Sequence, residues 1–514
     1  MLDIAPAEPR RAAPPLPAEA EVVIIGAGFS GLGTAIRLAE AGVDDVVLLE
    51  RASEIGGTWW ANTYPGCTCD VPSHLYSFSF APNPGWSETY ARQPEIEAYL
   101  QRVAAEFGVR DRVRTDCAVT GAAWEEDAAR WRVESSRGEI RARVLVSAAG
   151  PFAEPRWPDV PGLDRFGGRV FHSARWDHGY DLGGKRVAVV GTGASAIQVV
   201  PEIAPRVARL YVLQRTAPWV LPHRIRRIRA GERRVYRAVP AAQKGMRAVI
   251  YAGRELLVLG FAKRPPLMGV LERAARGHIR RQVRDPALRR AVTPDYLIGC
   301  KRILPSNRWY PALTRPNVEL IPEGLAAVTE RGVVTEGGRE LEVDAIVCGT
   351  GFHVTDMPIA GIVRGRDGRT LAETWNGSPR AHLGTTVPGF PNLFLMLGPN
   401  TGVGHSSMVY IIESQAAYVA AAVGAMRAQG VAAVEVRPEV AAASNAWVDA
   451  RARGTVWNTG CSSWYQDATG RNAALWPDWT FRFRRRLRRF DASEYRLRPA
   501  EPGARLVPAG ERVA

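Results

Sequence analysis

The chain has 514 residues, of which 46% are hydrophobic and 23% are charged, and its formal net charge is +15. This length allows about three domains, and the composition is that of a folded globular protein, which excludes a mainly disordered chain. The six cysteines are scattered without CxxC spacing or a disulfide framework, so we expect a protein of the reducing cytoplasm.

The first predicted element is a buried strand at residues 22–25, which leads into the turn GAGFSG at residues 26–31 and a helix through Leu38. Such a strand, tight turn and helix N-terminus present backbone N–H groups and a positive dipole to a pyrophosphate. Glu50 closes the next apolar run, 24 positions after Gly26, where a carboxylate accepts hydrogen bonds from ribose hydroxyls. This opening favours FAD, and its predicted contacts are Gly26, Gly28, Gly31 and Glu50.

A second opening of the same type follows a strand at residues 186–190, with the turn GTGASA at residues 191–196 and a helix that contains Pro201. The next strand ends in Gln214-Arg215-Thr216, without an acidic residue. An arginine beside a hydroxyl suits a 2′-phosphate, so NADPH is favoured over NADH, although Arg215 could equally be a solvated surface residue. The predicted NADPH contacts are Gly191, Gly193, Ser195, Arg215 and Thr216.

The segment from His223 to Pro294 is rich in arginine, alanine and leucine and shows patches of helical periodicity. It predicts an inserted helical subdomain that would shape a substrate cavity. Its apolar stretch Leu256–Phe261 is too short to span a bilayer, which leaves a peripheral membrane contact open but unsupported. Arginines cluster in this insert and at residues 482–489, but no recognition motif accompanies them, so we expect no nucleic-acid partner.

Beyond the insert, apolar residues from Leu341 to Val347 predict a strand that ends in the turn CGTGF at residues 348–352. We expect the chain to return there to the flavin, because glycine lets the backbone approach a cofactor closely. A further strand over residues 392–397 and the turn GPNTG precede a helix from about Ser407, whose N-terminus would face the flavin ring.

These elements predict an α/β fold with two dinucleotide-binding (Rossmann-like) domains, three-layer in architecture, with a helical insertion. Residues 1–19 are predicted to be a flexible N-terminal tail, and residues 20–150 the first part of the FAD-binding domain. Residues 151–340 would form the NADPH-binding domain, with its helical insert at about 223–294. Residues 341–514 would form the second part of the FAD-binding domain and the C-terminal segment. No metal site is expected.

Two longer patterns are more specific. Residues 166–177 read FGGRVFHSARWD and fit FxGxxxHxxxW(P/D), and residues 56–70 read GGTWWANTYPGCTCD and fit (A/G)GxWxxxx(F/Y)P(G/M)xxxD. Both patterns resemble those of type I (class B) Baeyer-Villiger flavoprotein monooxygenases, and the resemblance covers nearly the whole chain. The related flavin-containing and N-hydroxylating monooxygenases usually have another aromatic residue where Trp176 stands.

The resemblance implies a reaction in which NADPH reduces FAD and oxygen adds at flavin C4a. The resulting C4a-peroxyflavin would attack a small-molecule ketone, which becomes an ester or lactone. Arg302 resembles the family's catalytic arginine, a permanent cation that would keep the peroxide anionic. Asp70 resembles the carboxylate that orients this arginine. A purely structural ion pair is the alternative role for Arg302.

Further residues follow from the same resemblance. Lys301 is similar to a lysine that contacts the NADPH 2′-phosphate, and Trp464 is similar to a mobile-loop tryptophan that covers the nicotinamide cofactor. Alternatively, Lys301 is a solvated charge and Trp464 a core residue. Trp59, in the second pattern, and Tyr76 are expected near the flavin, although aromatic alternation around Tyr76 also describes a packed strand. We expect His172 to be structural or gating and not a general base.

Two other functions remain open. One is the oxidation of sulfur or nitrogen, as in flavin-containing monooxygenases, which use the protonated, electrophilic peroxide. The other is a flavoprotein that binds nucleotide and a macromolecular partner without oxygenation, which the basic helical insert motivates. The identity of the ketone and the oligomeric state are not specified by the sequence.

Overall fold

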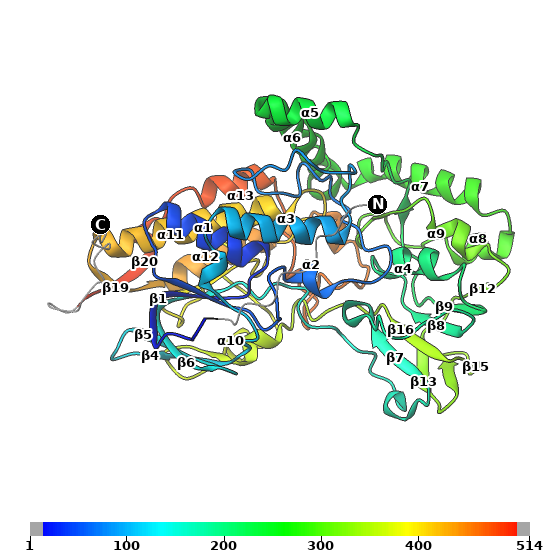
Figure 1. Ribbon diagram of the computed structural model, residues 1–514, viewed down its shortest axis with the longest axis horizontal. Coiled ribbons are helices and arrows are strands. Elements are labelled where there is room, and N and C mark those ends of the chain that lie inside the picture. Colours follow the sequence, from blue (N-terminus) through cyan, green and yellow to red (C-terminus); the bar gives the residue numbers. More distant parts are fainter. Residues whose placement is uncertain (1–13, 501–514) are drawn as a thin grey trace.

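The computed structural model describes residues 14–500, so most of the predicted N-terminal tail lies outside the described residues. The molecule is elongated, with one large sheet in each half (Figure 1). Two helices, α5 (Ala230–Ala238) and α6 (Pro240–Glu255), project at the top of this view, away from both sheets.

The first sheet has eight strands in the order β17-β4-β5-β6-β1-β2-β3, with β18 paired beside β6. The central strand β1 pairs in parallel with β2 and β6. Its Val22 and Ile24 face one apolar layer and its Val23 and Ile25 the opposite one, so both faces of the sheet are covered. The strands are β1 (Glu19–Ile25), β2 (Val46–Leu49), β3 (Val113–Arg114), β4 (Val119–Glu125), β5 (Arg130–Ser135), β6 (Gly138–Ser147), β17 (Val363–Arg364) and β18 (Leu393–Leu395).

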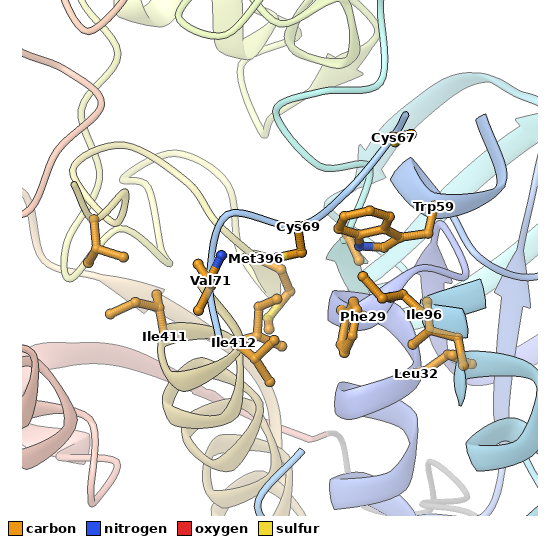
Figure 2. Packing of buried hydrophobic residues seen from close by; sticks show 14 of the residues in the cluster. Phe29, Leu32, Trp59, Cys67, Cys69, Val71, Ile96, Met396, Ile411 and Ile412 are labelled. Carbon is orange, nitrogen blue, oxygen red and sulfur yellow. Dashed lines mark hydrogen bonds between the residues drawn. The ribbon is translucent and has the colours of Figure 1, made fainter. Parts of the chain in front are cut away.

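Helices α1 (Phe29–Glu40) and α11 (Met408–Ala428) pack against each other. Figure 2 shows Phe29 and Leu32 of α1 facing the buried cluster that also contains Ile411 and Ile412 of α11. By length and composition α11 could cross a membrane, but 67% of its most apolar window is buried inside the molecule, so it is a core helix. This half also contains α2 (Thr58–Ala61), α3 (Gln93–Glu106), α10 (Leu371–Trp375), α12 (Pro438–Ala452), α13 (Thr480–Arg486) and the antiparallel pair β19 (Val431–Val436) and β20 (Tyr495–Pro499).

The second sheet is parallel throughout, in the order β12-β9-β8-β16-β7. Its strands are β7 (Arg169–His172), β8 (Arg186–Val190), β9 (Arg209–Leu213), β12 (Val318–Ile321) and β16 (Ala345–Cys348), accompanied by α4 (Ala196–Ile203) and α9 (Trp309–Leu313). A small antiparallel sheet is formed by β13 (Leu325–Val328), β14 (Gly332–Thr335) and β15 (Glu340–Glu342), and β10 (Val220–Leu221) pairs with β11 (Leu304–Pro305).

One sequence-based prediction is wrong here. The strand expected between Leu341 and Val347 does not return the chain to the first half, because β16 pairs with β7 and β8, with Ile346 opposite Val170 and Ala188. The chain rejoins the first sheet only through β17 and β18, so the boundary drawn at residue 341 moves beyond Cys348. A buried parallel strand is apolar on both faces, and such a run does not reveal which sheet it joins.

The segment between β10 and β11 is helical. In addition to α5 and α6 it contains a π-helical turn η4 (Leu259–Lys263), a 3₁₀ turn η5 (Pro265–Met268), α7 (Gly269–Gln282) and α8 (Pro286–Ala291). The remaining 3₁₀ turns are η1 (Arg110–Arg112), η2 (Leu163–Arg165), η3 (Ser173–Arg175), η6 (Pro358–Gly361), η7 (Val456–Asn458) and η8 (Ala492–Glu494).

Candidate functional site

The two glycine turns have the same geometry. Gly26 and Gly191 have φ angles of +102° and +101°, a conformation that side chains other than glycine rarely adopt. A Cβ at Gly26 would lie 2.7 Å from the carbonyl oxygen of Ala148, and a Cβ at Gly191 would lie 2.6 Å from that of Gly349. Both turns therefore bring the chain tightly past a neighbouring strand end and into a helix. Gly28 caps α1 and Gly31 lies in its first turn, while Gly193 and Ser195 precede α4.

Glu50 lies beside the first turn. Its Oε2 accepts a hydrogen bond from the backbone N–H of Ala27 at 2.8 Å, and its Oε1 accepts one from Ala52 at 2.9 Å. The side chain is buried, and burial raises its pKa although both backbone donors oppose the rise. The acid thus fixes the turn and lies directly beside it.

Arg215 and Lys301 place positive charge beside the second turn. The hydroxyl of Thr192, in that turn, donates to the carbonyl oxygen of Thr216 at 3.1 Å, which holds the strand end against the turn. Lys301 is half-buried, and burial together with the nearby charge of Arg215 lowers its pKa. Its Nζ lies 5.0 Å from the ring centroid of Tyr296. Two neighbouring cations at this turn suit a phosphate better than an uncharged ribose hydroxyl.

Asp70 and Arg302 form a bidentate ion pair across 232 positions of sequence. Nε of Arg302 donates to Oδ2 at 2.9 Å, and Nη2 donates to Oδ1 at 2.7 Å and to Oδ2 at 2.6 Å. Burial alone would raise the pKa of Asp70, but the charge and hydrogen bonds of Arg302 outweigh it and lower that pKa. In turn, Asp70 raises the pKa of Arg302. The pairing keeps both groups charged, and the side chains of Asp70 and Arg302 remain 21% and 30% exposed.

The segment that carries Asp70 contacts both nucleotide turns. Near the first turn, a Cβ at Gly57 would lie 3.0 Å from the Cα of Gly28. At the second turn, Gln198 of α4 accepts from the hydroxyl of Tyr64 at 3.0 Å and donates to the carbonyl oxygen of Thr68 at 2.9 Å. Sequence reasoning missed Gln198, because a polar residue on a helix gives no local sign of its tertiary partner.

Trp59 and Tyr76 lie together at the start of α1. The indole Nε1 of Trp59 donates to the hydroxyl of Tyr76 at 3.1 Å, and the ring of Tyr76 contacts that of Phe29 with centroids 5.2 Å apart. Tyr76 lies in a loop and not in a strand. Cys67 and Cys69 of the same segment are buried thiols in the apolar cluster drawn in Figure 2. Burial raises the pKa of Cys67 to about 12, which fits a thiol that packs in the core and does not react.

The pattern at residues 166–177 forms a packed corner beside the second sheet. The ring of Trp176 packs edge-on against Phe171, with centroids 4.9 Å apart, and Arg169 pairs with Asp177 at 2.6 Å. His172 is fully buried, its Nδ1 accepts from the N–H of Ala174 at 3.1 Å, and burial lowers its pKa to about 4. An uncharged, enclosed imidazole holds the corner together and has no access to a substrate proton.

A disulfide joins Cys300 to Cys461, which corrects the expectation of no disulfide framework. The 161 positions between the two cysteines leave no spacing signal, and only the fold brings them together. The bond ties the segment of Lys301 and Arg302 to the loop that carries Trp464. Trp464 is 40% exposed and is not a core residue, and its ring contacts Tyr465 with centroids 4.3 Å apart.

Tyr465 is a second residue that sequence reasoning missed. It is almost fully buried and lies close enough to the Asp70–Arg302 pair to interact with both charges. Burial raises its pKa to about 12. The aromatic pair at residues 464–465 could have drawn attention to it, but nothing local links this loop to Arg302.

The site contains two dinucleotide turns, each with charged groups that suit its nucleotide, and the partly exposed Asp70–Arg302 ion pair. This combination defines an oxidoreductase that binds a flavin and a nicotinamide nucleotide. Residues 23–228 match the family model described as pyridine nucleotide-disulphide oxidoreductase. A Baeyer-Villiger monooxygenase of Streptomyces coelicolor is 52% identical over 493 residues, which cover 95% of each chain.

Solved structures agree with this relationship. An oxidised steroid monooxygenase bound to NADP superposes with a TM-score of 0.82 at 33% identity, covering 94% of this chain and 100% of that one. The OTEMO complex with FAD and NADP gives a TM-score of 0.84 at 26% identity, covering 93% of this chain and 99% of that one. The chain belongs to the Baeyer-Villiger monooxygenase family.

Proposed function

We propose that this protein converts a ketone to an ester or lactone, with NADPH and O₂ as co-substrates and FAD as the resident cofactor. The observation that carries the proposal is the bidentate Asp70–Arg302 pair, placed where the segment at residues 56–76 contacts both glycine turns. The family and the FAD- and NADP-bound neighbour support the same chemistry.

Each cofactor has a matching set of residues. Gly26, Gly28, Gly31 and Glu50 would hold the FAD pyrophosphate and ribose, with Trp59 and Tyr76 close to the flavin. Gly191, Gly193, Ser195, Arg215, Thr216 and Lys301 would hold NADPH, and Trp464 would cover it. Bound FAD, reduced by NADPH, would activate O₂ so that one of its oxygen atoms is transferred to the ketone. The first sheet with its C-terminal return would thus be the FAD-binding domain, and the second sheet the NADPH-binding domain.

Arg302 is the group that acts on the reacting oxygen. Asp70 takes up Nε and Nη2, and within residues 14–500 no hydrogen bond engages Nη1. Nη1 therefore remains to meet the negative charge of the attacking oxygen and, later, of the former carbonyl oxygen. A guanidinium stays charged at every working pH, so it stabilises this charge without losing its proton.

The fixed cation also decides between the enzymatic alternatives. A cation beside the activated oxygen favours its anionic, nucleophilic form, which attacks a carbonyl carbon. Sulfur and nitrogen oxidation instead need a protonated, electrophilic oxygen. Because Arg302 cannot act as a proton donor under working conditions, the site favours ketones.

The test uses Arg302→Ala with a ketone and a thioether assayed in parallel. We expect ester formation to fall by at least about a hundredfold, the usual cost of losing a preorganised charge-stabilising donor. Sulfoxidation should fall much less. Equal losses on both substrates, or a native enzyme that yields only hydrogen peroxide across a broad ketone panel, would contradict the proposal.

The expected small-molecule partners are the ketone and O₂. The absence of a nucleic-acid partner and a cytoplasmic location stay predictions. Gel filtration and fractionation of expressing cells would check the oligomeric state and the location.

A further inference from the structure

One segment accounts for the net positive charge of the chain. Residues 223–294 contain 19 lysines and arginines but only four acidic residues, a balance of +15. This equals the net charge of the whole chain, so the rest of the sequence is neutral in sum. The binding of two polyanionic cofactors does not require this charge on the helical segment, because the glycine turns lie outside it.

Most of this charge faces solvent. Of the 19 basic side chains, 13 are exposed, whereas Asp285 is the one exposed acid of the segment. Two of the other acids are paired within it, Glu232 with Arg226 at 2.8 Å and Glu272 with Arg276 at 2.9 Å. The exposed basic residues are Arg224, Arg226, Arg227, Arg229, Arg234, Arg237, Lys244, Arg264, Arg273, Arg280, Arg281, Arg284 and Arg290.

Large apolar side chains are exposed on the same segment. Nine of the 13 exposed large hydrophobic residues within residues 14–500 lie between positions 225 and 270. Three of them exceed half exposure, Val249 at 69%, Leu256 at 60% and Val270 at 59%. The other six are Ile225, Val235, Val239, Met246, Leu259 and Leu267. We name these nine residues and the 13 exposed basic residues the insert surface.

The helical register places several of these apolar side chains on the same helix faces. Met246, Val249 and Leu256, along α6 and at its C-cap, follow one another at three and seven positions, a spacing that places them on one helix face. Val235 of α5 and Val239, four positions later at the turn into α6, share a face in the same way. Figure 1 shows this pair of helices at the outer edge of the molecule, where a flat partner can reach it.

We propose that the insert surface docks on an anionic lipid bilayer. Apolar side chains would enter the interface between headgroups and acyl chains, and the arginines around them would meet lipid phosphates. Nucleic acid fits less well, since a phosphate backbone offers no partner for nine exposed aliphatic side chains. This inference goes beyond the oxidation of ketones and does not depend on it.

The direct test is flotation of the full-length protein with vesicles of phosphatidylcholine alone or mixed with phosphatidylglycerol. We expect binding to the mixed vesicles only, weakening as salt rises. The charge variant Arg224→Glu, Arg227→Glu, Arg234→Glu removes three exposed cations of the insert surface. Each cation near an anionic membrane contributes about fivefold in affinity, so the loss of three cations and the added glutamates should weaken binding by at least about a hundredfold.

A matched control carries the same change in net charge elsewhere. Arg165, Arg315 and Arg453 are exposed and lie outside the segment, and their replacement by glutamate should have a much smaller effect, because distant charges are screened. The single variant Val249→Asn should weaken binding without any change in charge, which separates apolar insertion from charge alone.

Three results would overturn the proposal. They are equal binding to both kinds of vesicle, equal weakening by the charge variant and its control, and binding of single-stranded RNA in place of vesicles. Ketone oxidation measured without vesicles should stay unchanged in every variant, which shows that they fold. Loss of docking with intact oxidation, or the reverse, distinguishes failure of this inference from failure of the proposed function.

Discussion

Asp70→Asn tests the catalytic pair most directly. The carboxylate accepts contacts of 2.6, 2.7 and 2.9 Å from Arg302, and an amide of the same size keeps the volume but loses the charge. A hydrogen bond to a charged group contributes about 1.5 to 3 kcal/mol, and at least one of Nε and Nη2 would lose its acceptor. The guanidinium would then sample other positions, and a displacement of about 1 Å costs roughly a hundredfold in rate.

We therefore expect kcat for ester formation to fall by about a hundredfold in Asp70→Asn. The KM for NADPH should change little, because Arg215 and Lys301 hold that cofactor in our assignment. The assay measures ester formed, NADPH consumed and hydrogen peroxide released, so that oxygenation is separated from wasteful oxidation of NADPH. A purely structural role for the pair would lower the thermal midpoint without changing the ratio of ester to peroxide.

A double-mutant cycle with Arg302→Lys supplies the control. If Asp70 acts only by orienting Arg302, the double variant should be no slower than Arg302→Lys alone. Two other results would refute the reasoning. One is a full rate for Asp70→Asn, and the other is strictly additive losses, which would show that the two side chains act independently.

Three further predictions concern residues around the pair. Burial lowers the pKa of His172 from 6.5 to about 4. Between these two pH values the unfolded chain binds a proton at this residue and the native state does not. The free energy of unfolding should therefore fall by up to about 3 kcal/mol as the pH drops from 6.5 to 4. Denaturant titrations should show this slope flattened in His172→Gln, and an unchanged slope would contradict it. Cys461→Ser should lower the unfolding free energy by up to about 5 kcal/mol, which is the chain-entropy value for a loop of 161 residues. The variant should also lose the effect of reductant on the thermal midpoint. A reductant effect that persists in the variant would refute the assignment to Cys300–Cys461. Arg215→Ala and Lys301→Ala should each raise KM for NADPH about tenfold or more while leaving KM for NADH nearly unchanged, and parallel losses for both cofactors would contradict their assignment to the 2′-phosphate.

Features that act over a few residues could be predicted from the sequence. The turns at Gly26 and Gly191 combine an apolar strand, closely spaced glycines and a helix, and each of these signals is local. Glu50 follows from its distance along the chain, because one strand–helix–strand unit has a nearly fixed length. The contact between Asp70 and Arg302 was expected only from the family resemblance.

Features that depend on long-range packing could not be predicted. The apolar run of β16 suits either sheet, and only its pairing with β7 and β8 assigns it to the second. The disulfide and Tyr465 near Arg302 depend on the C-terminal loop folding back across more than 160 positions of sequence. Gln198 carries no pattern at all, since its role lies in bonds to Thr68 and Tyr64, 130 and 134 positions away in the sequence.

The position of Arg302 depends on both halves of the molecule at once. Asp70 holds the guanidinium from a segment that is bonded to α4 through Gln198, while Cys300 ties the arginine's own segment to the loop of Trp464. A shift of the second sheet relative to the first would therefore act on Asp70 through the Gln198 contact and on Arg302 through the disulfide. The two side chains would not move together. NADPH, bound at the second turn, would bias the same arrangement, because Lys301 adjoins Arg302 in sequence. We therefore expect NADPH binding to affect the placement of Arg302 through these contacts.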